Sequence, residues 1–400
     1  MKQDIFEKIP FDISEISPEK LNIEKKIRSN PLKWKGQFSP QLIEVLLENY
    51  SNEDDTVYDP FCGSGTVLFE SGRKGLSAYG TEINPAAVKL SKIYELINIS
   101  NDERVELIKF FDKSIHKMNS QKYPLFKDES TDNNGFFKSL EKIGSFIHEE
   151  DEYKKILYEF LIVGSNLHHE NLSKIWPKTR KLIKNLPFSG QVIRAYHADA
   201  RKSPLYSNTV DLVITSPPYI NVFNYHQQYR ESVEYLKYDI LKIAKSEIGS
   251  NRKNRSNRFL TAVQYCLDIA KTFNELRRIS KDNSRIIFIV GRESMVRGTR
   301  MYNSRILTEI ATEVMGFEFI LKQKREFVNQ FGTNIVEDIL HFSTNKKISS
   351  RKITKDDVLN VAVHFLEDSL QEAPPKALND IKEAINNAHN VKSSPIFKAN

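Results

Sequence analysis

Residues 215–219 read Thr-Ser-Pro-Pro-Tyr and follow an apolar run, 210–214, that is typical of a β-strand. Two consecutive prolines donate no backbone hydrogen bond and hold φ at about −65°, so the strand must end there. The result is a rigid corner at the carboxyl end of a strand, with a hydroxyl, unpaired carbonyl groups and an aromatic ring. Such a corner can hold a flat heterocycle and accept hydrogen bonds from its amino group. The candidate residues for such a binding corner are Ser216, Pro217, Pro218 and Tyr219.

A second motif precedes this corner. Residues 59–66 read Asp-Pro-Phe-Cys-Gly-Ser-Gly-Thr and lie between a predicted strand, 56–58, and a predicted helix, 67–73. Glycines at a strand-to-helix turn adopt positive φ and let a ligand approach the backbone closely. The dinucleotide fingerprint needs a third glycine and a phosphate loop needs Gly-Lys-Ser/Thr, so phosphate binding is disfavoured. Either motif alone fits an ordinary turn, but together on one alternating β/α chain they favour a binding site.

Acidic residues end the next two predicted strands. Glu82 follows strand 77–81, where an acid is placed to bind both ribose hydroxyls, and Ile83 beside it can pack on a purine face. Asp199 belongs to the end of a third strand, 192–200, and can accept a hydrogen bond from an adenine amino group. For Asp199 a polar turn residue is the alternative interpretation. Asp59 ends the first strand and is placed to accept from an ammonium group.

Composition sets broader limits. The 400 residues suit one large domain with an insertion or two domains, and 40% hydrophobic with 28% charged residues is ordinary for a globular protein. A net charge of +7 favours a polyanionic partner only weakly. Two separate cysteines predict neither a disulfide framework nor a zinc site, and no metal is expected. Without a signal core at the start or an apolar run near the ~18 residues of a membrane span, we expect a cytoplasmic protein.

The order of predicted elements favours an α/β fold, a mostly parallel sheet closed by an antiparallel C-terminal hairpin. We expect an N-terminal arm over 1–30 and a catalytic domain formed by 31–99 and 190–345. Between these lies a helical insertion, 100–189, whose aromatic stripes, including Phe136 and Phe137, are its own packing. A polar, partly helical tail follows over 346–400.

A flexible basic segment lies between the proline corner and the next long helix. It contains one acid, Glu247, and several asparagines among five cationic residues, a composition that suits phosphate contacts. A solvated loop is the alternative. The candidate residues for contacting the phosphates of a nucleic acid are Lys245, Arg252, Lys253, Arg255 and Arg258.

With both motifs on one chain, the sequence resembles the DNA amino-methyltransferases, which use S-adenosylmethionine to methylate the exocyclic amine of cytosine or adenine. The loop 59–66 is similar to their cofactor loop, residues 215–219 to their catalytic motif, and 36–40 (Gly-Gln-Phe-Ser-Pro) to the segment that closes over the cofactor. The similar blocks cover about 34–98 and 190–345. The resemblance implies a Rossmann-like methyltransferase sheet with S-adenosylmethionine as cofactor and double-stranded DNA as partner.

The resemblance also implies roles for single residues. Ser216 and the Pro217 carbonyl would accept hydrogen bonds from the target amine, and Tyr219 would stack on the extruded base. Glu82 would bind the ribose hydroxyls and Asp199 the adenine amine. The methionine end of the cofactor would contact Phe38 and Ser39. The methionine and adenosine parts would be held by Asp59, Phe61, Gly63, Gly65 and Thr66.

Serine at the catalytic motif favours cytosine N4 over adenine N6 in this family. A C5-cytosine enzyme needs a thiol after a proline, which neither Cys62 nor Cys266 provides. The family further implies site-specific methylation, in a restriction–modification system with a cognate endonuclease. The large insertion departs from the family pattern, so the insertion, the basic segment and the tail are all candidates for reading the DNA sequence. Two other functions stay open, an RNA amino-methyltransferase and a catalytically silent specificity subunit that binds DNA.

Overall fold

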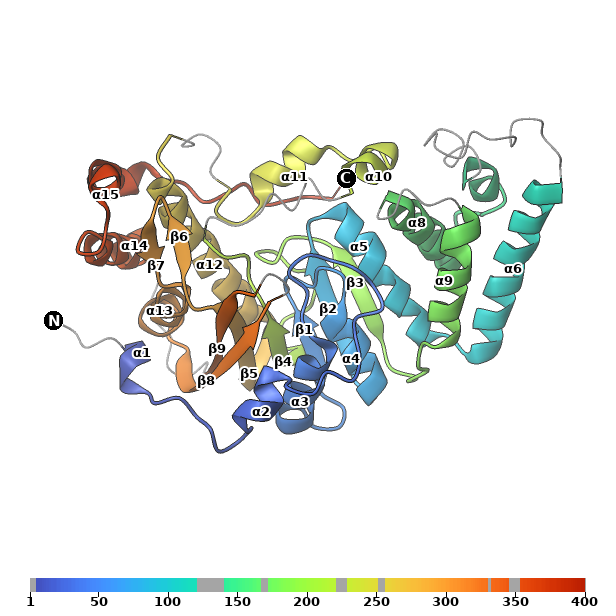
Figure 1. Cartoon of the computed structure of the whole chain (residues 1–400), viewed down its shortest axis with the longest axis horizontal. Coiled ribbons are helices and arrows are strands. Elements are labelled where there is room, and N and C mark those ends of the chain that lie inside the picture. The colour runs from blue at the N-terminus through green and yellow to red at the C-terminus, as the bar shows by residue number, and fades with distance from the viewer. Residues whose placement is uncertain are drawn as a thin grey trace.

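The computed structural model describes residues 5–120, 140–166, 172–220, 229–250, 256–329, 332–344 and 353–399. Its centre is a seven-stranded sheet in the order β3-β2-β1-β4-β5-β9-β8 (Figure 1). Strands β3, β2, β1, β4 and β5 pair in parallel, whereas β9 runs antiparallel to both β5 and β8. This confirms the predicted α/β fold with a mostly parallel sheet and an antiparallel C-terminal hairpin. The strands are β1 (Thr56–Asp59), β2 (Ser77–Glu82), β3 (Ile193–His197), β4 (Val210–Thr215), β5 (Ser280–Gly291), β8 (Glu318–Val328) and β9 (Asn334–Ser343).

Side chains of the central strands alternate between two hydrophobic layers, as the two-residue period of a strand requires. In β5, Ile286, Phe288 and Val290 pack into one layer, and Ile287 and Ile289 pack into the other. The sheet is therefore buried on both faces, which explains why its strands read as continuous apolar runs. Burying one such side chain contributes roughly 1.5–3 kcal/mol.

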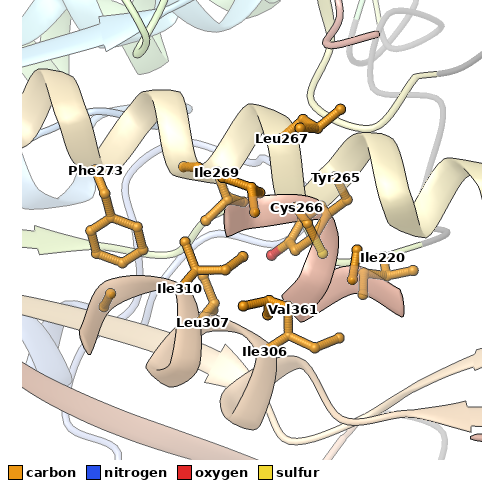
Figure 2. Close-up of a cluster of buried hydrophobic side chains, with 14 of the residues drawn as sticks. Ile220, Tyr265, Cys266, Leu267, Ile269, Phe273, Ile306, Leu307, Ile310 and Val361 are labelled. Atoms are coloured by element: carbon orange, nitrogen blue, oxygen red, sulfur yellow. The ribbon is translucent and has the colours of Figure 1, made fainter. Parts of the chain in front are cut away.

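Helices from the first half of the chain cover one face. They are α3 (Pro40–Tyr50), α4 (Thr66–Lys74) and α5 (Pro85–Ser91), which continues as a 3-10 helix over Lys92–Asn98. The other face is covered by α12 (Phe259–Ile279) and α13 (Asn303–Glu309), followed by a π-helical turn over Ile310–Val314. In Figure 2, Cys266 and Ile269 of α12 lie across from Ile306 and Ile310.

The insertion forms helices beyond strand β3, at one end of the sheet (Figure 1). They include α6 (Asn101–Ser120), α8 (Glu152–Asn166) and α9 (Leu172–Lys184). The apolar stripe of α8, with Leu157 and Leu161 fully buried, joins the same hydrophobic layer as α5. An ion pair of 2.7 Å between Lys89 and Glu159 ties the two helices together. Phe136 and Phe137 lie outside the described residues.

The segment expected to be a polar tail contributes to the core. Helices α14 (Lys355–Ser369) and α15 (Pro375–Asn387) bury one face each against α12, in the layer that also holds Phe288. On α15 the buried residues Ala377, Ile381 and Ala384 recur at helical spacing, so a sequence that is polar on average still presents an apolar stripe. After a 3-10 turn at Ala388–Asn390, the chain runs back along α12 towards α11 (Ile240–Ser246), as Figure 1 shows.

The N-terminal arm lies against the edge strand β8. Between its helices α1 (Ile5–Lys8) and α2 (Pro18–Asn22), Phe11 forms a β-bridge with Lys322 of that strand. The Lys322 ammonium lies 3.7 Å from the centre of the Phe6 ring and 4.4 Å from that of Phe11. The arm therefore covers an edge that would otherwise expose backbone hydrogen-bonding groups. Across the described ranges, every helix is too short or too polar to span a lipid bilayer.

Candidate active site

The two sequence motifs line one pocket at the carboxyl ends of the parallel strands. Its cavity volume is about 290 Å³, close to the lower end of the range of about 300–1,000 Å³ typical of small-molecule sites. Loops that follow parallel strands meet at the same edge of a sheet, which brings together segments far apart in the sequence. The predicted site residues that line the pocket are Phe38, Asp59, Phe61, Gly63, Thr66, Glu82, Ile83, Asp199, Ser216, Pro217, Pro218, Tyr219 and Arg258.

The glycine turn after β1 requires its glycines. Gly63 has φ +50° and Gly65 has φ +87°, values that side chains other than glycine rarely adopt. A Cβ added to Gly65 would also lie 2.9 Å from both the Ser91 Cβ and the Tyr94 ring. Gly65 therefore packs the start of α4 against the helix that follows β2 and lies behind the pocket, whereas Gly63 lines it.

Asp59 connects the glycine turn directly to the proline corner. Its carboxylate is only 1% exposed and accepts hydrogen bonds from the Thr215 hydroxyl (2.7 Å) and the Phe61 backbone N–H (3.0 Å). Thr215 is the last residue of β4 before the corner. Burial raises the pKa of Asp59 from 3.8 to about 7, because desolvation disfavours the charged form.

Glu82 shows the same pattern at the end of β2. Its two oxygens accept from the Gly63 N–H (3.1 Å) and the Asn84 N–H (2.9 Å), and burial raises its pKa to about 7. Within the described part of the chain, neither Asp59 nor Glu82 has a cationic partner. Two desolvated carboxylates in one pocket suit a ligand that offers an ammonium group and hydroxyl donors.

Asp199 lines the pocket, but the protein itself occupies its acceptor positions. One oxygen accepts from the Arg201 backbone N–H (2.9 Å) and Nε (2.8 Å). The other accepts from the Arg201 Nη2 (2.7 Å) and the Phe397 backbone N–H (2.8 Å). The predicted bond to an adenine amine would have to compete with these four. Arg201 was not among the predicted site residues, and its only signal in the sequence is its place two residues after a strand-end acid.

Ser216 and Tyr219 are half-buried neighbours at the proline corner. The two hydroxyl oxygens are 3.4 Å apart. The Tyr219 ring packs on Gly291 at the end of β5, where an added Cβ would come within 3.0 Å of the ring. Glycine at that position therefore leaves room for the aromatic ring beside the pocket.

Residues 34–38, which follow the arm, form another side of the pocket. Asn30 accepts from the Thr66 hydroxyl (3.1 Å) and donates to the Phe38 carbonyl (2.6 Å), while Gln37 accepts from the Ser64 hydroxyl (3.0 Å). Trp34 lines the pocket and stacks on Tyr229, with ring centres 5.6 Å apart. Ser39 lies just outside, as the N-cap residue of α3, and its buried hydroxyl has no partner among the described residues.

The predicted basic segment is only partly described. Arg258 is exposed and lines the pocket at the start of α12, and Lys245 is exposed on α11. Arg252, Lys253 and Arg255 lie outside the described residues.

Two further residues of α12 line the pocket and escaped sequence reasoning. Thr261 and Tyr265 are buried, and their hydroxyls find no partner in the described ranges. Their signal was weak, because polar groups four residues apart on an apolar helix are usually satisfied within the core.

Two features bear on the predictions made for metals and for cysteines. Burial raises the pKa of Cys62 well above its ordinary value, and both cysteines are buried. Searched over the described ranges, the chain has no cluster of three or more His, Cys, Asp or Glu side chains that could hold a metal ion.

The chain is similar to known DNA methyltransferases. A family model described as DNA methylase matches residues 3–93. The type II methyltransferase M.MjaII of Methanocaldococcus jannaschii is 26% identical over 174 residues, which cover 39% of this chain and 31% of that protein. The type II methyltransferase M.BsoBI of Geobacillus stearothermophilus is 21% identical over 323 residues, 64% of this chain and 62% of that protein. The chain thus spans less than two thirds of the length of either relative.

Among solved structures, an S-adenosylmethionine-dependent methyltransferase from Methanosarcina mazei aligns with a TM-score of 0.36 and 12% identity, over 75% of this chain and 97% of that one.

S-adenosylmethionine is the cofactor, and the pocket fits its groups. Buried Asp59 and half-buried Glu82 are acceptors for an ammonium and for ribose hydroxyls, and the positive φ of Gly63 lets a ligand approach the backbone. Together with the matches to DNA methylases, the glycine turn and the Ser-Pro-Pro-Tyr corner make this chain similar to the S-adenosylmethionine-dependent DNA amino-methyltransferases.

Proposed function

We propose that this chain methylates the exocyclic amine of one base at a specific sequence in double-stranded DNA, with cytosine N4 favoured over adenine N6. The observation that carries the proposal is the shared pocket, in which Asp59 and Glu82 on one side and Ser216 to Tyr219 on the other line one cavity. The hydrogen bond between Thr215 and Asp59 holds the two motifs in register.

The proline corner has to activate a weakly nucleophilic amine and hold it in place. An exocyclic amine is a poor nucleophile because its lone pair is delocalised into the ring. Ser216 and the carbonyl of Pro217 accept hydrogen bonds from its protons and favour a more tetrahedral nitrogen. S-adenosylmethionine, when bound, supplies an electrophilic methyl group on a sulfonium. Positioning then provides most of the acceleration, because effective molarities of well-aligned groups are large.

The target base must leave the duplex to reach this pocket, at a cost of a few kcal/mol. Stacking on an aromatic ring contributes about 1–3 kcal/mol per base, so Tyr219 offsets much of that cost. Gly291 leaves room for the Tyr219 ring itself, which packs on it beside the pocket.

The DNA backbone is expected to meet the basic segment. Arg258 lines the pocket and would contact a phosphate next to the extruded base, and we expect Lys245, Arg252, Lys253 and Arg255 to contribute further phosphate contacts, as their composition predicts. The helical insertion 100–189 is our first candidate for reading the target sequence. Because DNA is the substrate, we expect the protein to act in the cytoplasm, paired with a cognate endonuclease in a restriction–modification system.

Methylation-sensitive sequencing of DNA from cells that express the protein tests the proposal. We expect one modified sequence motif, with N4-methylcytosine at a fixed position, and no modification in cells that express Ser216→Ala. N6-methyladenine at a fixed position would keep the reaction and correct the base. Transfer of radiolabelled methyl groups to transfer RNA but not to duplex DNA would overturn the DNA assignment.

A further inference from the structure

The segment after α15 reaches the cofactor pocket without lining it. Residues 393–397, here called the strap, run beside α12 and the loop after β3. Phe397 is 7% exposed and Ser394 is 2% exposed, so both are firmly docked. Their partners are the groups that shape one end of the pocket.

Phe397 holds both residues predicted to contact the purine. Its backbone N–H donates to Asp199 at 2.8 Å. Its ring lies against His197, with ring centres 4.6 Å apart, and His197 Nε2 is 3.0 Å from the Ile83 carbonyl oxygen. Burial lowers the pKa of His197 to about 4, so the ring is neutral near pH 7 and donates Nε2–H to that carbonyl. One strap residue therefore supports Asp199 directly and Ile83 through a single intermediate.

Arg201 connects the strap to a second wall of the pocket. Its fully buried guanidinium donates to Asp268 (2.8 Å), to the Ser246 carbonyl (2.8 Å) and to the carbonyls of Ser394 and Pro395 (both 3.0 Å). It also forms the bidentate pair with Asp199 described above.

Ser394 and Asp268 fix the rest of that wall. The Ser394 hydroxyl donates to the Asp268 carboxylate at 2.7 Å, because an ionised carboxylate can only accept, and lies 2.9 Å from the Glu247 carbonyl oxygen. Asp268 in turn accepts from the Gly249 N–H at 3.0 Å. Residues 246–249 all line the pocket, so the strap, Arg201 and Asp268 set the position of this whole stretch.

We propose that the strap is a positioning element for S-adenosylmethionine, in which Phe397 and Ser394, acting through His197, Arg201 and Asp268, assemble the purine end of the pocket. The proposal rests on the cofactor assignment and not on the DNA substrate. Because binding energies are reciprocal, cofactor binding must stabilise the docked strap as much as the docked strap favours cofactor binding.

Calorimetry with S-adenosylhomocysteine, the non-reactive product, tests the first part of the proposal, that the docked strap favours cofactor binding. Phe397→Ala should raise its Kd at least tenfold, because it frees His197 and loosens the N–H bond to Asp199. Ser394→Ala, which removes only one hydroxyl, should raise it about threefold. The matched control is Val391→Ala, since Val391 is 4% exposed at the root of the same segment but packs in the hydrophobic layer with α14 and α15. Its Kd should stay within twofold of wild type.

Hydrogen exchange on the wild-type protein tests the second part of the proposal, that cofactor binding stabilises the docked strap. Saturating S-adenosylhomocysteine should slow exchange of the Ser394 and Phe397 amides at least fivefold, with no comparable change on α15. Equal Kd values for the Phe397 and Val391 variants, or unchanged exchange of the strap amides, would overturn the proposal that the strap positions the cofactor. A wild-type protein that binds no S-adenosylhomocysteine would instead refute the cofactor assignment.

Discussion

The two halves of the pocket are built in different ways. On the cofactor side, Asp59, Glu82 and Asp199 are each held by hydrogen bonds, and the supporting groups come from the glycine turn, from Arg201 (which α12 holds) and from the strap. On the catalytic side, Ser216 and Tyr219 sit on a short stretch whose shape comes from two prolines, with Gly291 making room behind the ring. The cofactor side is thus a long-range construction, whereas the corner is local. Substitutions at the corner should therefore alter chemistry alone, and those on the cofactor side should alter binding and stability together.

The largest effect expected is at Ser216. Ser216→Ala removes an acceptor that grips the target amine, and loss of one such group costs about 100-fold to 1,000-fold in rate. Single-turnover methylation of DNA should show this loss, while the Kd for S-adenosylhomocysteine stays within twofold. Tyr219→Phe, which keeps the ring and removes only the neighbouring hydroxyl, serves as the control and should lose less than tenfold. A large rise in Kd for Ser216→Ala would show that Ser216 also contributes to cofactor binding, and that the corner and the cofactor side do not act separately.

Gly65→Ala should lower the free energy of unfolding by about 2–4 kcal/mol. The left-handed backbone conformation costs about 1–2 kcal/mol, and the rest comes from crowding against Ser91 and Tyr94. Gly75→Ala is a matched control, because its φ of +78° is similar and nothing lies within 4 Å of an added Cβ. Urea unfolding of both variants separates the two terms. Equal losses would show that Gly65 is required only for its backbone conformation.

Affinity for the cofactor should increase with pH. Asp59 and Glu82 both have a pKa raised to about 7, so below pH 7 the ligand-free pocket is largely protonated and cannot pair with an ammonium group. Between pH 6 and 8, ionisation of Asp59 alone should lower the Kd for S-adenosylhomocysteine about tenfold. The raised pKa values also affect stability. Between about pH 4 and 7 the two carboxyls ionise in the unfolded chain but stay protonated in the folded, ligand-free protein, so the free energy of unfolding should fall as the pH rises through this range.

Asp59→Asn provides the comparison for that profile. The amide cannot ionise, so the remaining pH dependence should be shallower and reflect Glu82. Calorimetry in two buffers of different ionisation enthalpy should show proton release on binding at pH 6.5 for wild type and less for the variant. If Asp59→Asn leaves the pH dependence of the Kd unchanged, Asp59 does not pair with the ammonium group of the cofactor.

The smallest effect expected is at Arg258. Arg258→Glu should weaken DNA binding several-fold and reduce the slope of log K against log salt by about one, the amount expected for one lost phosphate contact. Lys74→Glu is the control, since Lys74 is exposed at the end of α4, which starts at the pocket and runs away from it. The same reversal at Arg252 and Arg255 tests the rest of the basic segment. An unchanged salt slope in all three variants would place the DNA backbone elsewhere.

The sequence alone predicts the local backbone conformation at both motifs. Two prolines after an apolar run must end a strand, and glycines between a strand and a helix must allow positive φ, as Gly63 and Gly65 do. These rules act between neighbouring residues, so the corner, the turn and the order of strands and helices could all be predicted. They also determined which chemistry the chain carries, namely acceptors for an amine and acids for a cofactor.

Only the tertiary structure decided what those groups touch. Asp199 reads as a free acceptor in the sequence, yet Arg201 and Phe397, the latter 198 residues away, use its oxygens. The tail reads as polar, yet α14 and α15 bury their apolar stripes against α12, and the strap reaches the cofactor pocket. The physical reason is that such bonds depend on the order in which strands are placed in the sheet, and a hydrogen bond between distant segments leaves no pattern in the residues around either partner.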